Sequence, residues 1–298
     1  MPELPEVETI VRDLKKEVLG RTFVDVWTDF PKMVKLPKSF EQFKKEIKGK
    51  KIQKIWRRGK NILINLPGNK TLLIHQKLTG HLLVGNWKLD ATHLPPSGNW
   101  KPLSKGPLEE PVNRFIHLMF WLSGGLMLAL SDLRKFAKVG LPSKEDLEKE
   151  LSFLGPEPLE KSFTLEKFKE ALENKKGKIK QVLMDQTVIV GIGNIYSDEI
   201  LWEAKIHPLK EVSKLTKDEL KKIYQAMRKI LEKSIKLGGE SISDFRRISG
   251  EIGYFDKERK VYRREGEKCI RCGTIIKRIK LAGRSAHFCP NCQQAKRI

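Results

Sequence analysis

The chain has 298 residues, 39% of them apolar, and carries 59 Lys and Arg against 37 Asp and Glu, a net charge of +22. This apolar content argues against global disorder, and the length is enough for two or three domains. No run of 18 apolar residues predicts a membrane span, and the acidic, proline-bearing N-terminus is unlike a secretion signal, so we expect a cytoplasmic protein. The basic charge favours a polyanion partner, nucleic acid above all, although a lysine-rich surface for solubility or heat tolerance is the alternative.

The N-terminal stretch "MPELPEVETI" predicts a helix that begins at Pro5. Apolar residues follow at helical spacing until Gly20, namely Val7, Ile10, Val11, Leu14 and Val18. Proline and acids in the first turn and glycine at the end are typical of a helix. Pro2 and Glu3 precede this helix, on a chain end that usually frays, so helix formation does not explain them.

The next stretches predict strands. Residues 21–28, 51–66, 71–85 and 115–132 are rich in β-branched and aromatic residues, and the last reads as a hairpin that turns at Ser123-Gly124-Gly125. Residues 88–112 contain five prolines and are predicted to form a long loop.

Beyond about residue 142 the apolar period becomes helical. Ser143 with Asp146, and Thr216 with Glu219, have the spacing of capping boxes, and 216–237 predicts a long basic helix. The predicted organisation is a mostly β domain over 1–140, a linker over 141–160, a helical domain over 161–265 and a cysteine-bearing tail over 266–298.

All four cysteines lie in that tail, as Cys269-x2-Cys272, sixteen residues, and Cys289-x2-Cys292. This is the spacing of a structural zinc site, and a disulfide framework would need an oxidising compartment that nothing in the sequence indicates. The segment between the pairs alternates like a β-hairpin. Because so short a tail cannot bury a core of its own, we expect one zinc ion to hold it.

A glycine turn between two predicted helices is a candidate phosphate site. Gly191 and Gly193 permit close approach of the backbone, and Asn194 stands where a helix N-terminus presents free N–H groups. A simple N-cap role for Asn194 is the alternative. Lys175 and Lys180 lie just upstream and predict DNA contacts, or otherwise a solvated helix start.

Three separated motifs, "MPELPEVET", "LMDQ…GIGNIYSDEIL…IHP" and "C-x2-C…GRSAHFCPNCQ", resemble the formamidopyrimidine-DNA glycosylases, base-excision repair enzymes related to endonuclease VIII. The resemblance covers essentially the whole chain. It implies an α+β multidomain fold, with an N-terminal two-layer β-sandwich with flanking helices, a helix-two-turn-helix domain and a C-terminal β-hairpin zinc finger.

The resemblance implies a catalytic role for Pro2, which becomes the terminal residue once Met1 is removed. Its amine would attack the sugar C1′, release the damaged base and form an iminium, from which β- and δ-elimination break the strand. Glu3 resembles the acid/base acting on the sugar O4′, and Glu6 a supporting carboxylate, unless Glu6 is only a first-turn helix acid. Lys60 and Arg284 match a lysine that assists β-elimination and an arginine implicated in δ-elimination.

The resemblance also implies residues that contact and open the duplex. Asn194 and His75 match phosphate contacts, and Lys175 matches a DNA-contacting lysine. Leu78, where the family has methionine, together with Arg134 and Phe136, would fill the space left by a flipped nucleotide. The chain departs from the family at three positions. Phe115 stands where a DNA-contacting histidine is common, with His117 nearby, and Leu133 and Lys135 replace a usual proline and arginine. Lesion choice is expected to depend on a loop at about 241–258.

The expected function is removal of oxidised purines, namely 8-oxoguanine and formamidopyrimidines, from double-stranded DNA. We expect a zinc-containing monomer without a nucleotide cofactor or a membrane partner, located in the cytoplasm at the prokaryotic nucleoid. The alternatives are a non-catalytic sensor of damaged or abasic DNA, a family member that prefers oxidised pyrimidines or hydantoins, and an RNA- or ribosome-binding zinc-ribbon protein. The sensor leaves the retention of Pro2, Glu3, Lys60 and Arg284 unexplained.

Overall fold

The computed structural model describes residues 1–89, 99–241 and 244–294. They form two compact units, each made of two chain segments. We call Met1–Ser152 with Leu237–Tyr254 the sandwich unit, and Phe153–Lys236 with Phe255–Ile298 the zinc unit. The predicted domains divided the chain differently, because they assigned residues 237–254 to the helical part.

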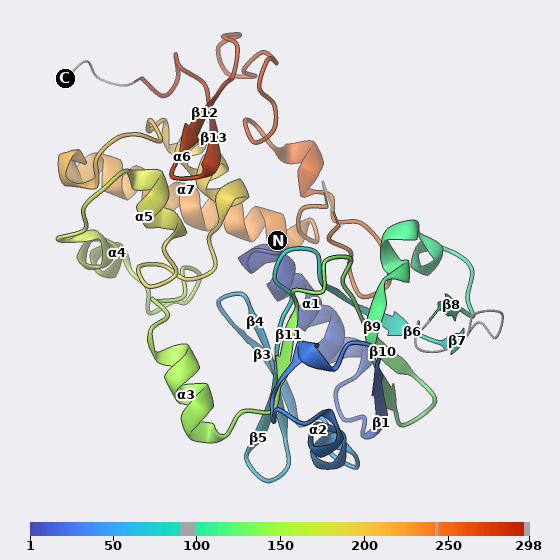
Figure 1. Cartoon of the computed structure of the whole chain (residues 1–298). Helices are drawn as coiled ribbons and strands as arrows, with labels where there is room; N and C mark the ends of the chain where they lie inside the picture. Colours follow the sequence, from blue (N-terminus) through green and yellow to red (C-terminus); the bar gives the residue numbers. More distant parts are fainter. Residues whose placement is uncertain (90–98, 242–243, 295–298) are drawn as a thin grey trace. The chain divides into compact units, whose positions relative to one another are not determined.

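The sandwich unit contains two mostly antiparallel sheets (Figure 1). The first has the order β1 (Phe23–Thr28), β9 (Ile116–Leu122), β10 (Met127–Ser131), β6 (His81–Gly85). The second has the order β2 (Val34–Leu36), β11 (Lys138–Gly140), β5 (Lys70–His75), β4 (Asn61–Leu66), β3 (Lys54–Arg58), with β2 and β11 parallel. Four predicted strand stretches thus supply most of both sheets, and the expected hairpin of β9 and β10 is confirmed.

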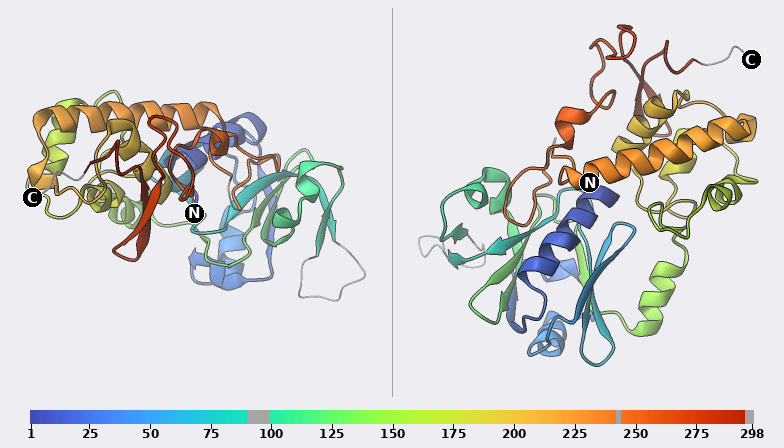
Figure 2. Two further views of the ribbon diagram at one scale, coloured as in Figure 1. Left: turned by 90° about the horizontal axis from the view of Figure 1, so that it is seen from above. Right: turned by 180° about the vertical axis from the view of Figure 1, so that it is seen from behind.

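Helix α1 (Leu4–Glu17) follows the predicted pattern closely, packs against β3 and β4, and shares one apolar core with both sheets (Figure 2, right). Its buried face includes Val7, Ile10 and Leu14. Each such side chain contributes about 1.5–3 kcal/mol when fully buried, so the core fixes the helix and the chain end that precedes it. Helices α2 (Phe40–Ile47) and α3 (Lys144–Ser152) complete this unit, with the 3₁₀ turn η1 (Pro31–Met33).

The proline-rich stretch 88–112 is only partly the predicted loop. Strands β7 (Trp87–Leu89) and β8 (Trp100–Pro102) pair, and η2 (Pro107–Glu109) and η3 (Pro111–Arg114) follow. The Trp100 ring packs edge-on against Trp27 and Trp121, with centroid distances of 5.2 and 5.8 Å. These aromatic contacts order a stretch whose prolines alone predict irregular backbone.

Segment 237–254 joins the sandwich unit through long-range polar contacts. The Arg247 guanidinium binds the Asp13 carboxylate at 2.9 and 3.0 Å, and the Val84 N–H donates to the Ile248 carbonyl at 2.7 Å. These partners lie far apart in the sequence, so local patterns could not assign the segment to this unit.

The zinc unit has a helical part and a hairpin. Its elements are α4 (Leu165–Leu172), α5 (Ile179–Met184), α6 (Asn194–Ala204), η4 (Val212–Lys214), α7 (Lys217–Lys236), η5 (Phe255–Glu258), β12 (Lys277–Leu281) and β13 (Arg284–Phe288). The predicted capping box holds, because the Glu219 N–H donates to Thr216 Oγ1 and the Thr216 N–H donates to Glu219 Oε2. Helices α6 and α7 pack together, and the buried Tyr196 hydroxyl lies 2.6 Å from Ser234 Oγ.

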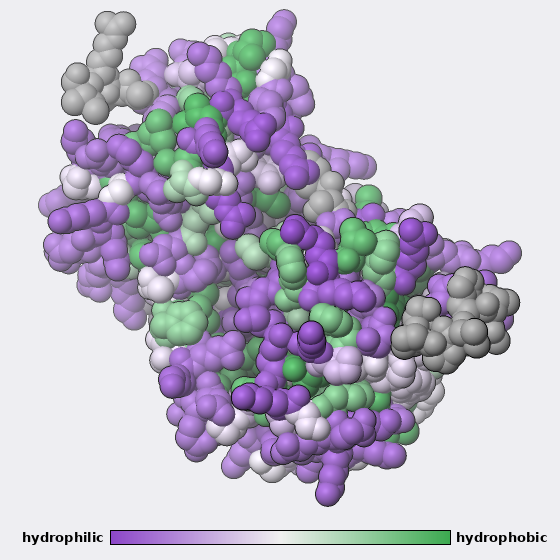
Figure 3. Space-filling model, in the orientation of Figure 1, coloured by the Kyte–Doolittle hydropathy of each residue, from purple (hydrophilic) through white to green (hydrophobic). Residues whose placement is uncertain are grey.

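The face of the molecule shown in Figure 3 is largely hydrophilic, with apolar side chains scattered between the polar ones. Within the described residues, none of the helices combines the length and the apolar character that a bilayer crossing would need. The role of each cationic side chain therefore depends on its own surroundings.

Candidate catalytic and DNA-binding site

The N-terminal residues are buried and are held in place by Glu6. Glu3 and Glu6 are 2% and 1% exposed, and Pro2 is also buried. Glu6 Oε2 accepts a hydrogen bond from the Glu3 N–H at 2.8 Å, and Glu6 Oε1 accepts one from the Glu240 N–H at 2.9 Å. The expected supporting carboxylate is therefore a bridge between the chain start and segment 237–254. A chain end held this way cannot fray.

Glycine is required beside this bridge. Gly239 has a φ of +85°, and a Cβ there would lie 3.1 Å from Glu6 Oε1 and from its Cγ. A larger residue would therefore be strained in its own backbone and would press on the carboxylate that fixes Glu3.

The terminal amine lies in an environment that favours its neutral form. Burial lowers the pKa of the Met1 amine, Lys60 lowers it further, and the carboxylates of Glu3, Glu6 and Asp244 oppose the shift without cancelling it. Because a neutral amine is the nucleophilic form, this end of the chain is suited to attack an electrophilic carbon.

Lys60 lies in the tight turn between β3 and β4, where Gly59 has a φ of +58°. Lys60 is only 7% exposed, which is an unusual burial for a lysine, so it is not an ordinary surface cation. Its charge acts on the terminal amine and on His75 as well. The charges of Lys60 and Glu3 thus both act on the terminal amine, with opposite effects on its pKa.

His75 ends β5 as a neutral imidazole. Burial, together with the charges of Lys77, Lys60 and Lys138, lowers its pKa to about 3. Its Nδ1 accepts a hydrogen bond from the Lys77 N–H at 3.0 Å, which leaves the ring hydrogen on Nε2. His75 can therefore offer a phosphate a hydrogen bond without carrying a charge itself.

Two turns carry the predicted void-filling residues. Leu78 follows β5, and the turn with Arg134 and Phe136 follows β10. The buried Asp132 carboxylate ties them, because it accepts hydrogen bonds from the Thr79 hydroxyl and from the Ala137 N–H, the latter at 2.7 Å.

The side chains at the second turn are presented to solvent. Phe136 and Leu133 are 48% and 51% exposed, and the Arg134 guanidinium carbon lies 4.8 Å from the Phe136 ring centroid. Exposed apolar groups on a rigid turn are suited to inserting into an unstacked duplex. Leu133, in place of a usual proline, adds to this apolar surface.

Phe115 and His117 both have partners within the fold. The Arg114 guanidinium carbon lies 5.1 Å from the Phe115 ring centroid, and His117 Nδ1 lies 2.9 and 3.0 Å from the two Asp29 oxygens. One ring nitrogen of His117 is thus engaged by Asp29.

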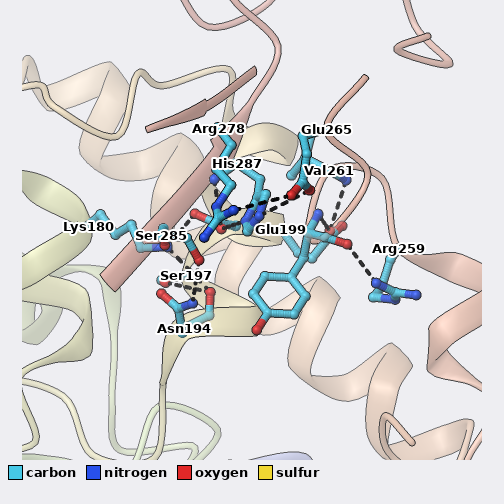
Figure 4. Close-up of polar contacts among 12 residues, drawn as sticks. Lys180, Asn194, Ser197, Glu199, Arg259, Val261, Glu265, Arg278, Ser285 and His287 are labelled. Atoms are coloured by element: carbon cyan, nitrogen blue, oxygen red, sulfur yellow. Dashed lines mark hydrogen bonds and ion pairs between the residues drawn. The ribbon is translucent and has the colours of Figure 1, made fainter. Parts of the chain in front are cut away.

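In the zinc unit, Asn194 lies beside Ser285, the residue that follows Arg284 on β13 (Figure 4). Asn194 is the first residue of α6, whose N-cap is Gly193, so the N-cap alternative for Asn194 does not hold. Its Nδ2 donates to Ser285 Oγ at 3.5 Å, and its buried Oδ1 has no hydrogen-bond partner among the described residues. Arg284 is exposed and begins β13, directly after a turn in which Ala282 and Gly283 both have positive φ.

Lys180 differs from its prediction as a DNA contact. It is 1% exposed, and its Nζ donates to Asp198 Oδ1 at 2.5 Å, to the Ser285 carbonyl at 2.9 Å and to the Asn194 carbonyl at 3.4 Å. An ammonium enclosed in this way joins α5, α6 and β13 and does not reach a phosphate. Lys175 lies beyond α4 and is exposed, as a direct contact requires.

Two buried carboxylates that the sequence analysis did not single out organise the same region. Asp198 Oδ2 accepts hydrogen bonds from the N–H of His287 and faces its Nδ1, both at 2.9 Å. Glu199 accepts the N–H groups of three successive residues, Lys260, Val261 and Tyr262, at 2.8–3.0 Å. The sequence carried a signal for them, because Asp198 and Glu199 are followed directly by the apolar residues 200–202 in the same helix, where buried acids need partners.

The four cysteines form a metal site. Their sulfur atoms all lie within 4.8 Å of one another, and three of the pairs are 3.4–3.9 Å apart. Tetrahedral zinc with bonds of about 2.3 Å places sulfurs about 3.8 Å apart, so the arrangement fits. Burial and the three neighbouring sulfurs raise the pKa of Cys292 to about 12, a crowding that a dication relieves. Cys269, Cys272, Cys289 and Cys292 would hold one structural zinc ion.

The comparisons with known proteins agree with these features. Residues 1–139 match the family described as "Formamidopyrimidine-DNA glycosylase N-terminal domain", residues 154–246 match "Formamidopyrimidine-DNA glycosylase H2TH domain", and residues 266–295 match "Zinc finger found in FPG and IleRS". The fold and the site therefore define a zinc-finger DNA glycosylase of the helix-two-turn-helix class.

Individual relatives are similar over the full length. A formamidopyrimidine-DNA glycosylase from Bacillus cereus is 38% identical over 98% of this chain and 99% of its own, and one from Herpetosiphon aurantiacus is 39% identical over 98% and 100%. A Lactococcus lactis FPG variant solved with Fapy-dG-containing DNA aligns with a TM-score of 0.84 at 38% identity, over 99% and 100% of the two chains. MutM solved with carbocyclic 8-oxo-G-containing DNA aligns with a TM-score of 0.83 at 39% identity, over the same shares. The chain belongs to the formamidopyrimidine-DNA glycosylase family, whose members are base-excision enzymes with abasic-site lyase activity.

Proposed function

We propose that this protein excises oxidised purines from double-stranded DNA through a Schiff base on Pro2 and then cleaves the strand by β,δ-elimination. The observation that carries the proposal is the buried chain start, in which Glu6 clamps Glu3 and burial lowers the pKa of the terminal amine, which Met1 carries until it is removed. Related proteins have been solved with Fapy-dG-containing, 8-oxo-G-containing and abasic DNA, which supports oxidised purines as the substrate class.

The nucleophile is the amine of Pro2 after removal of Met1. Its nitrogen forms a bond to C1′ while the bond from C1′ to the damaged base breaks, and the base leaves with the electron pair and takes up the proton that the proline nitrogen gives up. The buried Glu3 carboxyl protonates O4′, so that the sugar ring opens and a cationic iminium remains. Because the amine of proline is secondary, the iminium is charged without further protonation and makes the C2′ hydrogen acidic.

The elimination steps follow from that iminium. Loss of the C2′ proton expels the 3′ phosphate, and a second elimination expels the 5′ phosphate and leaves a one-nucleotide gap. Lys60 is proposed to assist the first step, since it is buried and acts electrostatically on the terminal amine. Arg284, exposed on the hairpin, is proposed to bind phosphate and assist the second.

The remaining predicted residues are proposed to hold and open the duplex. His75, Asn194 and Lys175 contact phosphates. Lys180 contributes indirectly, because its ammonium group donates hydrogen bonds to the carbonyls of Asn194 and Ser285. Leu78, Arg134 and Phe136 enter the space of the flipped nucleotide, with Arg134 against the orphaned cytosine. Since the substrate is chromosomal DNA, we expect the protein to act as a monomer at the nucleoid in the cytoplasm.

Borohydride trapping tests the proposal. The zinc-loaded, Met1-processed protein is incubated with an 8-oxoguanine duplex and borohydride, and the reduced covalent complex is digested and mapped by mass spectrometry. We expect the sugar remnant on the N-terminal peptide. DNA binding without any adduct would favour the sensor function, and an adduct on another peptide would reassign the nucleophile.

A blocked N-terminus supplies the matched control. A short tag before Pro2 is expected to abolish the adduct while leaving duplex binding intact, and the same tag at the C-terminus is expected to leave both unchanged. Trapping with a thymine glycol duplex in parallel distinguishes a preference for oxidised pyrimidines.

A further inference from the structure

Trp202 lies in the last turn of α6, within the zinc unit, where the helix meets the metal-binding loops. It is 4% exposed and belongs to a small apolar cluster that includes two of the four cysteines, Cys269 and Cys289. Val261 and Ile276 complete that cluster. The indole ring therefore forms part of the wall around the metal site.

The indole N–H of Trp202 is buried and lacks a close hydrogen-bond partner among the described residues. Cys269 belongs to the same buried cluster, and hydrogen bonding from the Trp202 side chain helps to lower the pKa of the Cys269 thiol against the effect of its burial. A buried indole N–H normally finds an acceptor, and a zinc-bound thiolate is a far better acceptor than a neutral thiol. The unmet donor thus shares a buried cluster with a sulfur that is charged when it binds the metal.

Arg271 clamps the same loop onto the helix. It lies between Cys269 and Cys272 in the chain, and its guanidinium carbon is 3.8 Å from the Trp202 ring centroid. Its Nη1 also donates to the Trp202 carbonyl at 3.0 Å, in the last turn of α6, where that carbonyl also accepts the Lys205 N–H at 3.1 Å. Arg271 therefore holds Trp202 both by stacking on its ring and by a hydrogen bond to its carbonyl.

The second metal-binding loop is fixed to the same part of the chain. Gln293 is fully buried, its Oε1 accepts the Cys289 N–H at 2.9 Å, and its Nε2 donates to the Ile206 carbonyl at 2.9 Å. Both cysteine pairs are thus attached at the C-terminal end of α6.

We propose that Trp202 is an outer hydrogen-bond donor to the zinc ligand Cys269, held by Arg271, so that zinc binding and the C-terminal end of α6 stabilise each other. Outer hydrogen bonds orient metal ligands, and losing one typically weakens metal affinity 10- to 100-fold. The inference does not depend on Pro2 chemistry, since it concerns the metal site alone.

The experiment uses the Trp202→Phe variant of the full, zinc-loaded chain, which keeps an aromatic ring and removes the N–H. Zinc release into excess chromogenic chelator is expected to be about 10- to 100-fold faster than in the parent. The matched control is Trp56→Phe, which removes an indole N–H bonded to Asn65 Oδ1 at 2.8 Å in the sandwich unit. That variant is expected to release zinc at the parent rate.

Fluorescence adds a readout that loss of packing would not reproduce. The chain has six tryptophans, and only Trp202 belongs to the zinc unit. Chelation is expected to change the emission of the parent and of Trp56→Phe, and to leave that of Trp202→Phe unchanged. Equal release rates for Trp202→Phe and Trp56→Phe, or a chelation response that persists without Trp202, would overturn the proposal.

A second variant covers the case in which Trp202→Phe does not fold. Arg271→Gln keeps the indole and removes the clamp, and it is expected to release zinc several-fold faster than the parent, by the same loss of ligand orientation. An unchanged release rate in Arg271→Gln would show that Arg271 does not hold Trp202 in place, and would refute the proposed role of Trp202 as a donor to the zinc ligand Cys269.

Discussion

The two compact units differ in what supplements their apolar cores. In the sandwich unit, α1, α2 and both sheets share one large apolar core, and the chain start that we propose as catalytic lies at the N-terminal end of α1. The zinc unit also buries apolar side chains, but four sulfurs and the buried Lys180–Asp198 ion pair hold its hairpin, and the Glu199 carboxylate holds residues 260–262. The proposed catalytic residues thus rest mainly on a hydrophobic scaffold, and part of the DNA-binding surface depends on metal and charge.

Zinc removal is expected to have the largest effect and to separate the two units. Structural zinc supplies about 10–16 kcal/mol of apparent binding free energy in small domains, and without it four crowded thiols cannot hold the hairpin. Chelation should abolish duplex binding, while near-ultraviolet circular dichroism from the five tryptophans of the sandwich unit persists.

Restoration of binding on adding zinc is the control for that experiment. Simultaneous loss of the tryptophan signal on chelation would show that the sandwich unit needs the metal as well, and would remove the contrast between the units.

Breaking the buried ion pair is the next largest perturbation. Lys180→Met leaves the buried Asp198 carboxylate without its ammonium partner, with His287 still facing it, and losing one partner of a buried ion pair costs about 3–5 kcal/mol. Thermal unfolding followed by circular dichroism should show a clear fall in Tm. Lys222→Met, which removes the same residue type from an exposed pair with Asp218, is expected to leave Tm nearly unchanged.

Equal Tm values for Lys180→Met and Lys222→Met would mean that the buried pair contributes no more than a surface one. The zinc unit would then rest on the metal and on its apolar side chains, and buried charge would no longer distinguish it from the sandwich unit.

These examples show which features the sequence could predict. The cysteine spacing, the α1 periodicity and the Thr216–Glu219 capping box are local patterns, and the structure confirms all three. Lys180 is indistinguishable in sequence from its exposed neighbours, because its burial depends on Ser285, which lies 105 residues away. The membership of 237–254 in the sandwich unit likewise depends on distant partners such as Asp13.

The stability of the sandwich unit is expected to fall in acid because of His75. Burial and nearby lysines lower its folded pKa to about 3, against about 6.5 when unfolded. Above pH 6.5 both states are neutral, and as the pH falls only the unfolded state takes up a proton, so the folded state loses stability down to about pH 3. At pH 5 this loss amounts to about 2 kcal/mol.

His75→Asn keeps an acceptor for the Lys77 N–H but has no titrating ring. Urea unfolding at pH 7 and pH 5 is therefore expected to show a smaller stability difference in the variant than in the parent. An identical pH dependence would mean that His75 does not remain neutral in the folded sandwich unit.

The smallest expected effect concerns the hairpin as a phosphate-binding element. Arg284 is exposed on β13, and if it neutralises one phosphate, Arg284→Ala should lower the slope of log affinity against log salt by about 0.9. The control is Arg12→Ala, which removes an exposed arginine paired with Glu8 on α1 and is expected to leave the slope unchanged. Equal slopes for Arg284→Ala and the parent, measured by fluorescence anisotropy on one duplex, would place phosphate binding elsewhere in the zinc unit. A lower slope confined to Arg284→Ala would instead show that the metal-held hairpin itself binds the DNA backbone, which is the functional reason for giving that unit a polar framework.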